Sequence, residues 1–147
     1  MTTALTLDLA NETRRRILQD PGFFYREVLG VSPYEKQLDI AKAVLRYPQV
    51  AVVGPNAGGK DWNTAVIILL WLQLWDKAKV IIYGPTYRQV ADILWNEVQS
   101  RYYGAKVSLG GQMNKEPNSG YQIDPDRFAI GFSAEKPILP RASTVLI

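Results

Sequence analysis

The chain has 147 residues, 47% of them hydrophobic, and its 17 Lys and Arg against 14 Asp and Glu give a net charge of +3. Length and composition are those of one globular domain, and so small a positive surplus does not by itself indicate a nucleic-acid partner. Because Cys and His are absent, disulfides, thiolate metal sites and histidine catalysis are excluded. Any catalysis must use carboxylates, Lys, Arg, backbone amides and a divalent cation.

The N-terminal third of the chain is predicted to be helical. Its first residues, MTTALTLDLANETRRR, lack the apolar core of a signal peptide, and the longest apolar run, Ala65 to Leu72, is too short to span a bilayer. We therefore expect a soluble intracellular protein without a membrane partner. Residues 11–29 look helical, and Asp20-Pro21-Gly22 divides them into two short helices. The basic run Arg14 to Arg16 is either a solvated helix face, the more common case, or a contact to DNA phosphates.

The middle of the chain has the pattern of strands and helices in alternation. Ser32-Pro33 opens a helix at 34–47, and Pro48 ends it. The run QVAVVG (49–54) is β-branched and closed by a glycine, as is typical of a buried parallel strand. The helix predicted at 61–75 is apolar nearly all round, so we expect it to be buried on most sides.

The second half begins with one more strand and helix, and then contains only short predicted strands and a polar segment. AKVIIYG (78–84) predicts another buried strand, and Thr86 can cap a helix at 87–103. Three further strands are expected, AKVSL, RFAIGFSA and STVLI, and a polar loop or hairpin separates the first two. This order predicts an α/β domain with a largely parallel sheet.

One short motif carries chemistry. VGPNAGGKD nearly matches the phosphate-loop template G-x-x-x-x-G-K followed by Ser or Thr, through Gly54, Gly59 and Lys60. Such a loop needs glycines so that backbone N–H groups face the phosphates, a helix N-terminus behind them, and a lysine for the outer oxygens. The alternative is a glycine-rich turn without function, but a loop between a strand and a helix favours phosphate binding. Its remaining residues are Pro55, Asn56, Ala57 and Gly58.

Asp61 departs from the template, which has a magnesium-binding hydroxyl at this position. A carboxylate can bind Mg²⁺, but it brings negative charge close to the phosphates. At about 5 Å and an effective dielectric constant near 20, the repulsion is roughly 3 kcal/mol per unit charge. Alternatively, Asp61 only stabilises the helix N-terminus, where a negative charge is favourable.

Several motifs in order resemble a known family. DPGFFYREVLG (20–30), PYEKQ (33–37), the glycine loop, VIIYGPTYRQVADILWNEV (80–98) and GFSAEKP (131–137) follow one another as in the ATPase domain of the large subunit of tailed-phage terminases. The resemblance covers residues 20–147. It implies an ATP-driven motor that packages double-stranded DNA into a prohead, which in the family is followed by a separate nuclease domain.

The resemblance also implies a fold and its limits. We expect a RecA-like P-loop NTPase domain, a mainly parallel sheet with helices on both faces, with the loop after its first strand. Residues 1–32 would be a helical lead-in and 33–147 an incomplete ATPase domain. The family continues from a strand such as TVLI into the Asp-Glu pair that binds Mg²⁺ and activates water, so we expect a domain truncated at its C-terminal side, without the nuclease domain.

Individual roles follow from the resemblance, with ATP and Mg²⁺ as cofactors. Tyr34 and Gln37 match the adenine-recognising element, and Gly54 to Lys60 the phosphate-binding loop, with Asp61 as a metal ligand. Asn56 stands where the family often has a charge-stabilising basic residue. Three residues match the segment that couples nucleotide state to DNA contact: Thr86, Arg88 and Gln89.

The expected partners are double-stranded DNA and, by resemblance, the portal protein, the terminase small subunit and further copies of the chain in a ring, in the host cytoplasm. Two alternatives stay open: another DNA motor of the helicase type, and an inactive fragment that binds nucleotide or DNA weakly. Because Asp61 disturbs the magnesium position and the catalytic carboxylates are missing, we expect weak ATP binding and negligible hydrolysis.

Overall fold

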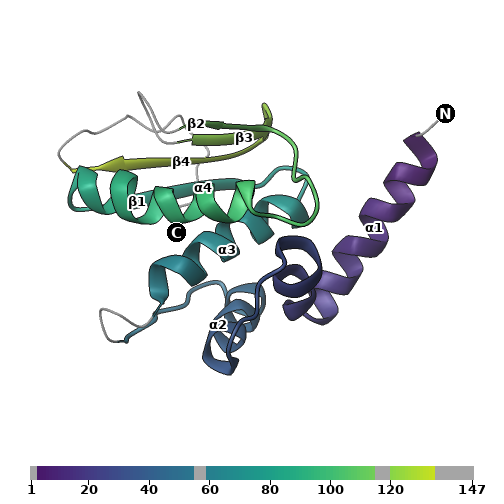
Figure 1. Cartoon of the computed structure of the whole chain (residues 1–147), viewed down its shortest axis with the longest axis horizontal. Coiled ribbons are helices and arrows are strands. Elements are labelled where there is room, and N and C mark those ends of the chain that lie inside the picture. Colours follow the sequence, from purple (N-terminus) through teal and green to yellow (C-terminus); the bar gives the residue numbers. More distant parts are fainter. Residues whose placement is uncertain (1–2, 55–58, 115–119, 135–147) are drawn as a thin grey trace.

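The computed structural model describes residues 3–54, 59–114 and 120–134 (Figure 1). The two elements written η are wound as π-helices, and η2 continues directly into α4. The elements in chain order are α1 (Thr3–Gln19), η1 (Phe24–Leu29), α2 (Glu35–Arg46), α3 (Lys60–Leu74), β1 (Lys79–Gly84), η2 (Arg88–Leu94), α4 (Trp95–Tyr103), β2 (Gln112–Asn114), β3 (Gly120–Asp124) and β4 (Arg127–Ser133). The predicted helix break at Asp20-Pro21-Gly22 and the helix after Pro33 are confirmed.

The described strands form one four-stranded mixed sheet in the order β1-β4-β3-β2. Only β1 and β4 are parallel, in a register that runs from Lys79 opposite Phe128 to Gly84 opposite Ser133. The pairs β3–β4 and β2–β3 are antiparallel. The prediction of a mainly parallel, RecA-like sheet is therefore wrong.

A tight turn explains why most of this sheet is antiparallel. Only Pro125 and Asp126 separate β3 from β4, and the side chain of Asp124 accepts a hydrogen bond from the Asp126 N–H group at 2.8 Å. Asp commonly stabilises turns in this way. A connection of this length can join only antiparallel neighbours, because parallel strands need a crossover of a dozen or more residues.

Two of the predicted strands are not formed. Residues 49–54 are extended but pair with no described strand, and Val53 is 98% exposed. Residues 105–109 are irregular, with Val107 donating one backbone hydrogen bond to the Val28 carbonyl at 3.2 Å. Both runs contain β-branched residues, three in 49–54 and Val107 in 105–109, but a strand also needs a partner that satisfies its backbone groups and covers its side chains.

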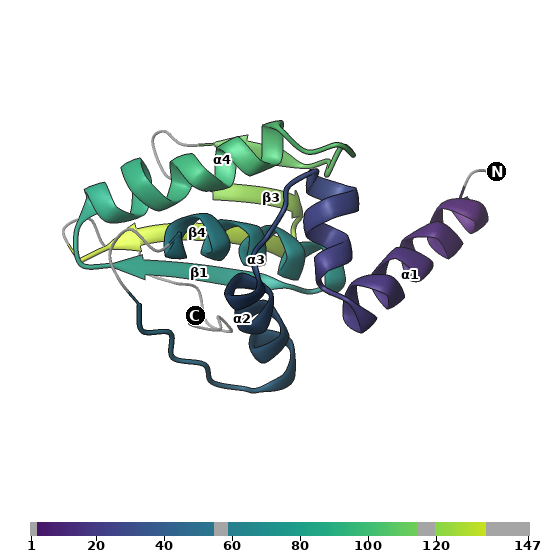
Figure 2. The same ribbon diagram turned by 60° about the horizontal axis from the view of Figure 1, so that its bottom comes forward.

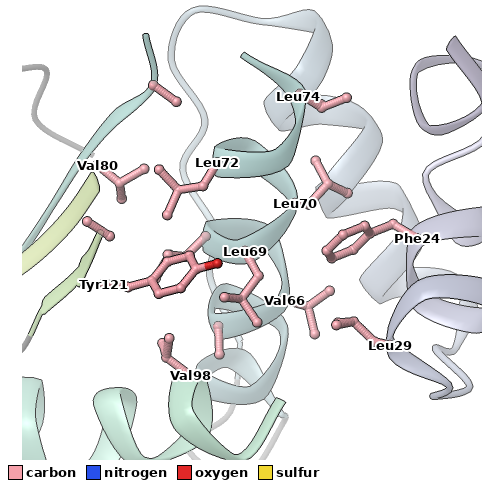
Figure 3. Packing of buried hydrophobic residues seen from close by; sticks show 14 of the residues in the cluster. Phe24, Leu29, Val66, Leu69, Leu70, Leu72, Leu74, Val80, Val98 and Tyr121 are labelled. Carbon is pink, nitrogen blue, oxygen red and sulfur yellow. The ribbon is translucent and has the colours of Figure 1, made fainter. Parts of the chain in front are cut away.

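The core is built around α3 (Figure 3). Phe24 and Leu29 from η1 pack on one side of this helix, Val80 and Tyr121 from the sheet on another, and Val98 from α4 on a third. Burial on several sides is what the apolar composition of this segment predicted, and this prediction is confirmed. At its far end, Arg127 donates hydrogen bonds to the Leu72 carbonyl and so ties β4 to the last turn of α3.

In Figures 1 and 2 the described helices lie on one side of the sheet, with α3 and α4 against it and η1 and α2 beyond α3. The expected arrangement of helices on both faces is not found among the described residues. The two views agree that the start of α3, the start of η2 and the carboxyl ends of β1 and β4 lie at the same end of the molecule. In α/β proteins, ligands bind at the carboxyl ends of parallel strands.

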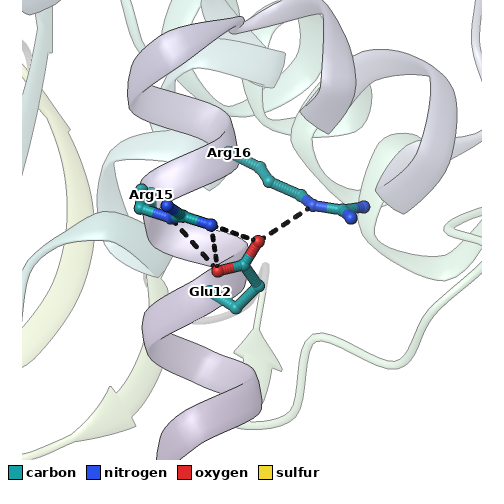
Figure 4. Close-up of polar contacts among 3 residues, drawn as sticks. All are labelled: Glu12, Arg15 and Arg16. Carbon is teal, nitrogen blue, oxygen red and sulfur yellow. Dashed lines mark hydrogen bonds and ion pairs between the residues drawn. The ribbon is translucent and has the colours of Figure 1, made fainter.

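The basic residues of α1 are engaged in ion pairs within the chain. Glu12 accepts hydrogen bonds from Arg15 and Arg16 (Figure 4), and Arg14 pairs with Asp76 just after α3. The arginines lower the pKa of the Glu12 carboxyl, with the hydrogen bond from Arg15 as the largest cause. No helix formed by the described residues is long and apolar enough to cross a membrane.

Candidate functional site at the start of α3

Gly59 forms the entry to α3. Its φ of 74° lies in the left-handed region, which glycine adopts without strain, and its carbonyl accepts the first helical hydrogen bond, from the Asn63 N–H group at 3.0 Å. A glycine has no side chain with which to cap the helix. The first N–H groups of a helix have no partner within it, and the positive end of the helix dipole lies there, so the start of a helix can bind an anion.

Gln37 and Tyr34, at the start of α2, lie against Gly59. A methyl group built on Gly59 would come within 3.2 Å of the Gln37 Nε2 atom and 3.6 Å of the Tyr34 hydroxyl oxygen. The Gln37 side chain is buried, and its Oε1 accepts a hydrogen bond from the Tyr34 N–H group at 3.1 Å. The tertiary structure thus brings together residues that the sequence analysis had assigned to base recognition and to phosphate binding.

The Lys60 side chain reaches back to Gly54. Its Nζ donates a hydrogen bond of 2.8 Å to the carbonyl of Gly54, so the ammonium group lies at the point where the glycine loop begins. Asp61 is exposed in the first turn of α3. The rest of the predicted loop, Pro55, Asn56, Ala57 and Gly58, lies outside the described residues.

A buried polar network behind these residues was missed by the sequence analysis. Tyr25 donates a hydrogen bond to the Asn63 Oδ1 atom, and the Asn63 Nδ2 atom donates one to the Gln37 carbonyl at 3.3 Å. Burial raises the pKa of the Tyr25 hydroxyl well above its usual range. The only signal in the sequence is the presence of an amide, Asn63, close to the apolar run of α3.

Trp62 lies beside this network. Its ring is 6.0 Å from that of Tyr25, between centroids, and the Arg101 guanidinium of α4 lies 5.8 Å from the centre of the indole. A cation at this distance from an indole is weakly attracted to it. An intrinsic fluorophore is therefore part of the first turn of α3.

The predicted coupling segment begins η2. The Thr86 hydroxyl accepts a hydrogen bond from the Gln89 N–H group at 3.2 Å, which agrees with its expected role as a cap, whereas Arg88 and Gln89 are exposed. The start of η2 lies at the same end of the molecule as the start of α3 (Figure 2). Contact of these residues with DNA stays a prediction.

Within the described ranges, no three acidic side chains lie close enough together to hold a metal ion. Asp61 is the carboxylate that begins α3 next to Lys60, and its role as a magnesium ligand stays a prediction.

No protein family, curated protein or solved structure matches this chain.

Proposed function

We propose that the chain binds a nucleoside triphosphate at the start of α3, as part of a DNA-packaging motor of the terminase type. The observation that supports this most directly is the contact of Gln37 and Tyr34 with Gly59. Those residues lie more than twenty positions apart in the sequence, and in this proposal their contact joins the amide that recognises the base to the loop that binds the phosphates. The order of the motifs along the chain, which resembles that of terminase large subunits, supports the assignment to a packaging motor.

Each residue has a specific task in this proposal. Lys60 exchanges its hydrogen bond to the Gly54 carbonyl for the outer phosphate oxygens, while the N–H groups of the first turn of α3 bind the inner ones. Because its Oε1 is already held by the Tyr34 N–H group, Gln37 presents its Nε2 atom as a donor toward an acceptor on the base. The exposed ring of Tyr34 supplies a stacking surface.

Asp61 sets the strength of binding. A bound Mg²⁺ ion would neutralise part of the phosphate charge, which the exposed Asp61 carboxylate otherwise opposes. Solvent and salt screen an exposed charge further, so the penalty is smaller than the ~3 kcal/mol that follows from an effective dielectric constant near 20. We therefore expect affinity in the range of weak nucleotide binders rather than none.

A direct test measures the affinity for ATP with Mg²⁺ by calorimetry for four chains: the wild type, Lys60→Ala, Lys42→Ala and Asp61→Thr. Lys42 is an exposed lysine on α2, so its variant makes the same charge change away from the loop. Lys60→Ala should weaken binding by about tenfold or more, as expected on loss of a charge-assisted hydrogen bond, and Lys42→Ala by less than about twofold. Asp61→Thr should strengthen binding by about tenfold.

Equal affinities for Lys60→Ala and Lys42→Ala would rule out the glycine loop as the phosphate site. If Asp61→Thr binds no better than the wild type, the carboxylate serves the magnesium ion well enough, and our account of this position fails while the site itself stands.

A further inference from the structure

We propose that Asn63 and Tyr25 are positioning residues of this site, because their buried side chains hold the start of α2 against the start of α3 and so keep the Gln37 amide beside Gly59. The inference rests on the proposed nucleotide site and adds to it a determinant of base recognition. Both act on base recognition through Gln37.

The geometry centres on Asn63, which is 2% exposed. Its main-chain N–H group donates to the Gly59 carbonyl at 3.0 Å, and its side-chain Nδ2 atom donates to the Gln37 carbonyl at 3.3 Å. One residue is thus bonded to the main chains of the two residues whose contact defines the site. Helix geometry alone accounts for the first bond, but the second depends on the amide side chain.

Tyr25 fixes the orientation of that amide. Its hydroxyl donates to the Asn63 Oδ1 atom, so the oxygen of the amide is engaged and the nitrogen faces Gln37. Tyr25 is completely buried, and it belongs to η1, which packs against α3. The network therefore connects η1, α2 and α3 at one point.

A purely structural role would be better served by an apolar residue. Burying an amide and a phenol costs free energy unless their hydrogen bonds are made, and replacing such a network with apolar groups of similar shape is often neutral for stability. The bonds here instead fix the main chain of Gln37, whose side chain faces Gly59. Hydrogen bonds require specific distances and directions, so this network fixes the position of α2 more narrowly than apolar packing alone would.

Loss of this network should affect the binding of the base and the binding of the phosphates differently. The phosphates depend on Lys60 and the start of α3, and the hydrogen bond from Lys60 to the Gly54 carbonyl does not involve Asn63 or Tyr25. The base depends on Gln37. Weakening the network should therefore reduce the affinity for ATP and leave that for inorganic tripolyphosphate nearly unchanged.

The experiment measures both affinities, with Mg²⁺, for the wild type, Asn63→Leu and Tyr25→Phe. The control is Tyr121→Phe, which also removes a buried tyrosine hydroxyl, but one bonded to the carbonyls of Leu109 and Gly110 on the other side of the core. Asn63→Leu should weaken ATP binding about tenfold, and Tyr25→Phe about fivefold, with less than about a twofold change for tripolyphosphate. Tyr121→Phe should leave the ratio of the two affinities at its wild-type value.

Three outcomes would contradict the inference. A wild-type ratio in both Asn63→Leu and Tyr25→Phe would overturn it while the nucleotide site stands. A parallel loss of ATP and tripolyphosphate affinity would show a role in general folding rather than in positioning. If the wild type binds neither ligand, the proposed function and this inference fail together. Tyr25→Phe keeps the ring and its packing, so the test remains decisive even if Asn63→Leu does not fold.

Discussion

Two short segments of this chain have a similar apolar pattern, but only one of them forms a strand. VAVVG (50–54) and VIIYG (80–84) are both β-branched, both end in glycine and are both followed by a helix. The second forms β1, in which Val80 is completely buried between the sheet and α3. The first is extended without a described partner, and Val53 is 98% exposed.

The difference lies in what surrounds each segment. β1 pairs along its whole length with β4, so the backbone groups on that edge are hydrogen-bonded. The side chains of Val80, Ile81 and Ile82 are buried. Segment 50–54 has the same local preference but neither a pairing strand nor a helix over it among the described residues. Strand propensity is therefore realised only where tertiary contacts support it.

The largest expected difference is in the stability of two variants, each of which introduces one negative charge into one of the segments. Val80→Asp would bury an unpaired carboxylate and should cost about 4 kcal/mol or more, enough to unfold a marginally stable domain. Val53→Asp should change stability by less than about 0.5 kcal/mol, because the side chain is already in solvent. Urea unfolding followed by circular dichroism measures both, and a comparable loss in the two variants would show that segment 50–54 is packed in solution.

A smaller difference is expected at the two glycines. Neither Gly54 nor Gly84 has a positive φ, so only space decides the outcome. A methyl group on Gly84 would come within 2.7 Å of the Val90 Cγ2 atom, and Gly84→Ala should cost about 1–3 kcal/mol through overpacking. A methyl group on Gly54 meets only the flexible Lys60 chain at 3.8 Å, so Gly54→Ala should cost less than about 0.5 kcal/mol. Equal urea midpoints would contradict the comparison.

The smallest expected effect is on the pH dependence of stability, and it concerns a buried tyrosine of the sheet. Burial is the main cause that raises the pKa of Tyr121, on β3, to about 12. The folded state therefore keeps a proton that the unfolded state releases above its pKa of ~10. This contribution to stability is complete below pH ~10 and is lost as the pH rises toward the folded pKa, with a slope of at most ~1.4 kcal/mol per pH unit.

Tyr121→Phe should make the fall in stability between pH 10 and 12 shallower, as measured by urea midpoints at each pH. The slope is the relevant quantity, because the variant also loses the hydroxyl's hydrogen bonds to backbone carbonyls and is less stable at neutral pH. An unchanged slope would mean that this tyrosine is ionised equally easily in both states.

Helices were more predictable than the sheet, for a physical reason. The limits of α2 follow from Pro33 and Pro48, and the start of α3 from the glycine loop, because each of these features acts within a few residues. Thr86 was identified as a cap because its hydroxyl needs only a backbone N–H group three residues away. The direction of β3 could not be derived from its own residues, because it depends on the turn that joins it to β4 and on which strands meet.

The sequence by itself determined the local features: the helix break at Asp20-Pro21-Gly22, the cap at Thr86, and a helix apolar enough to be the centre of the core. These depend on the conformational freedom of single residues and on periodicity. Only the tertiary structure decided that β1 pairs with β4 while 50–54 stays unpaired, and that Gln37, Asn63 and Tyr25 meet behind Gly59. Pairing and burial depend on groups distant in sequence, and the free energy that selects among them arises only when these groups come together.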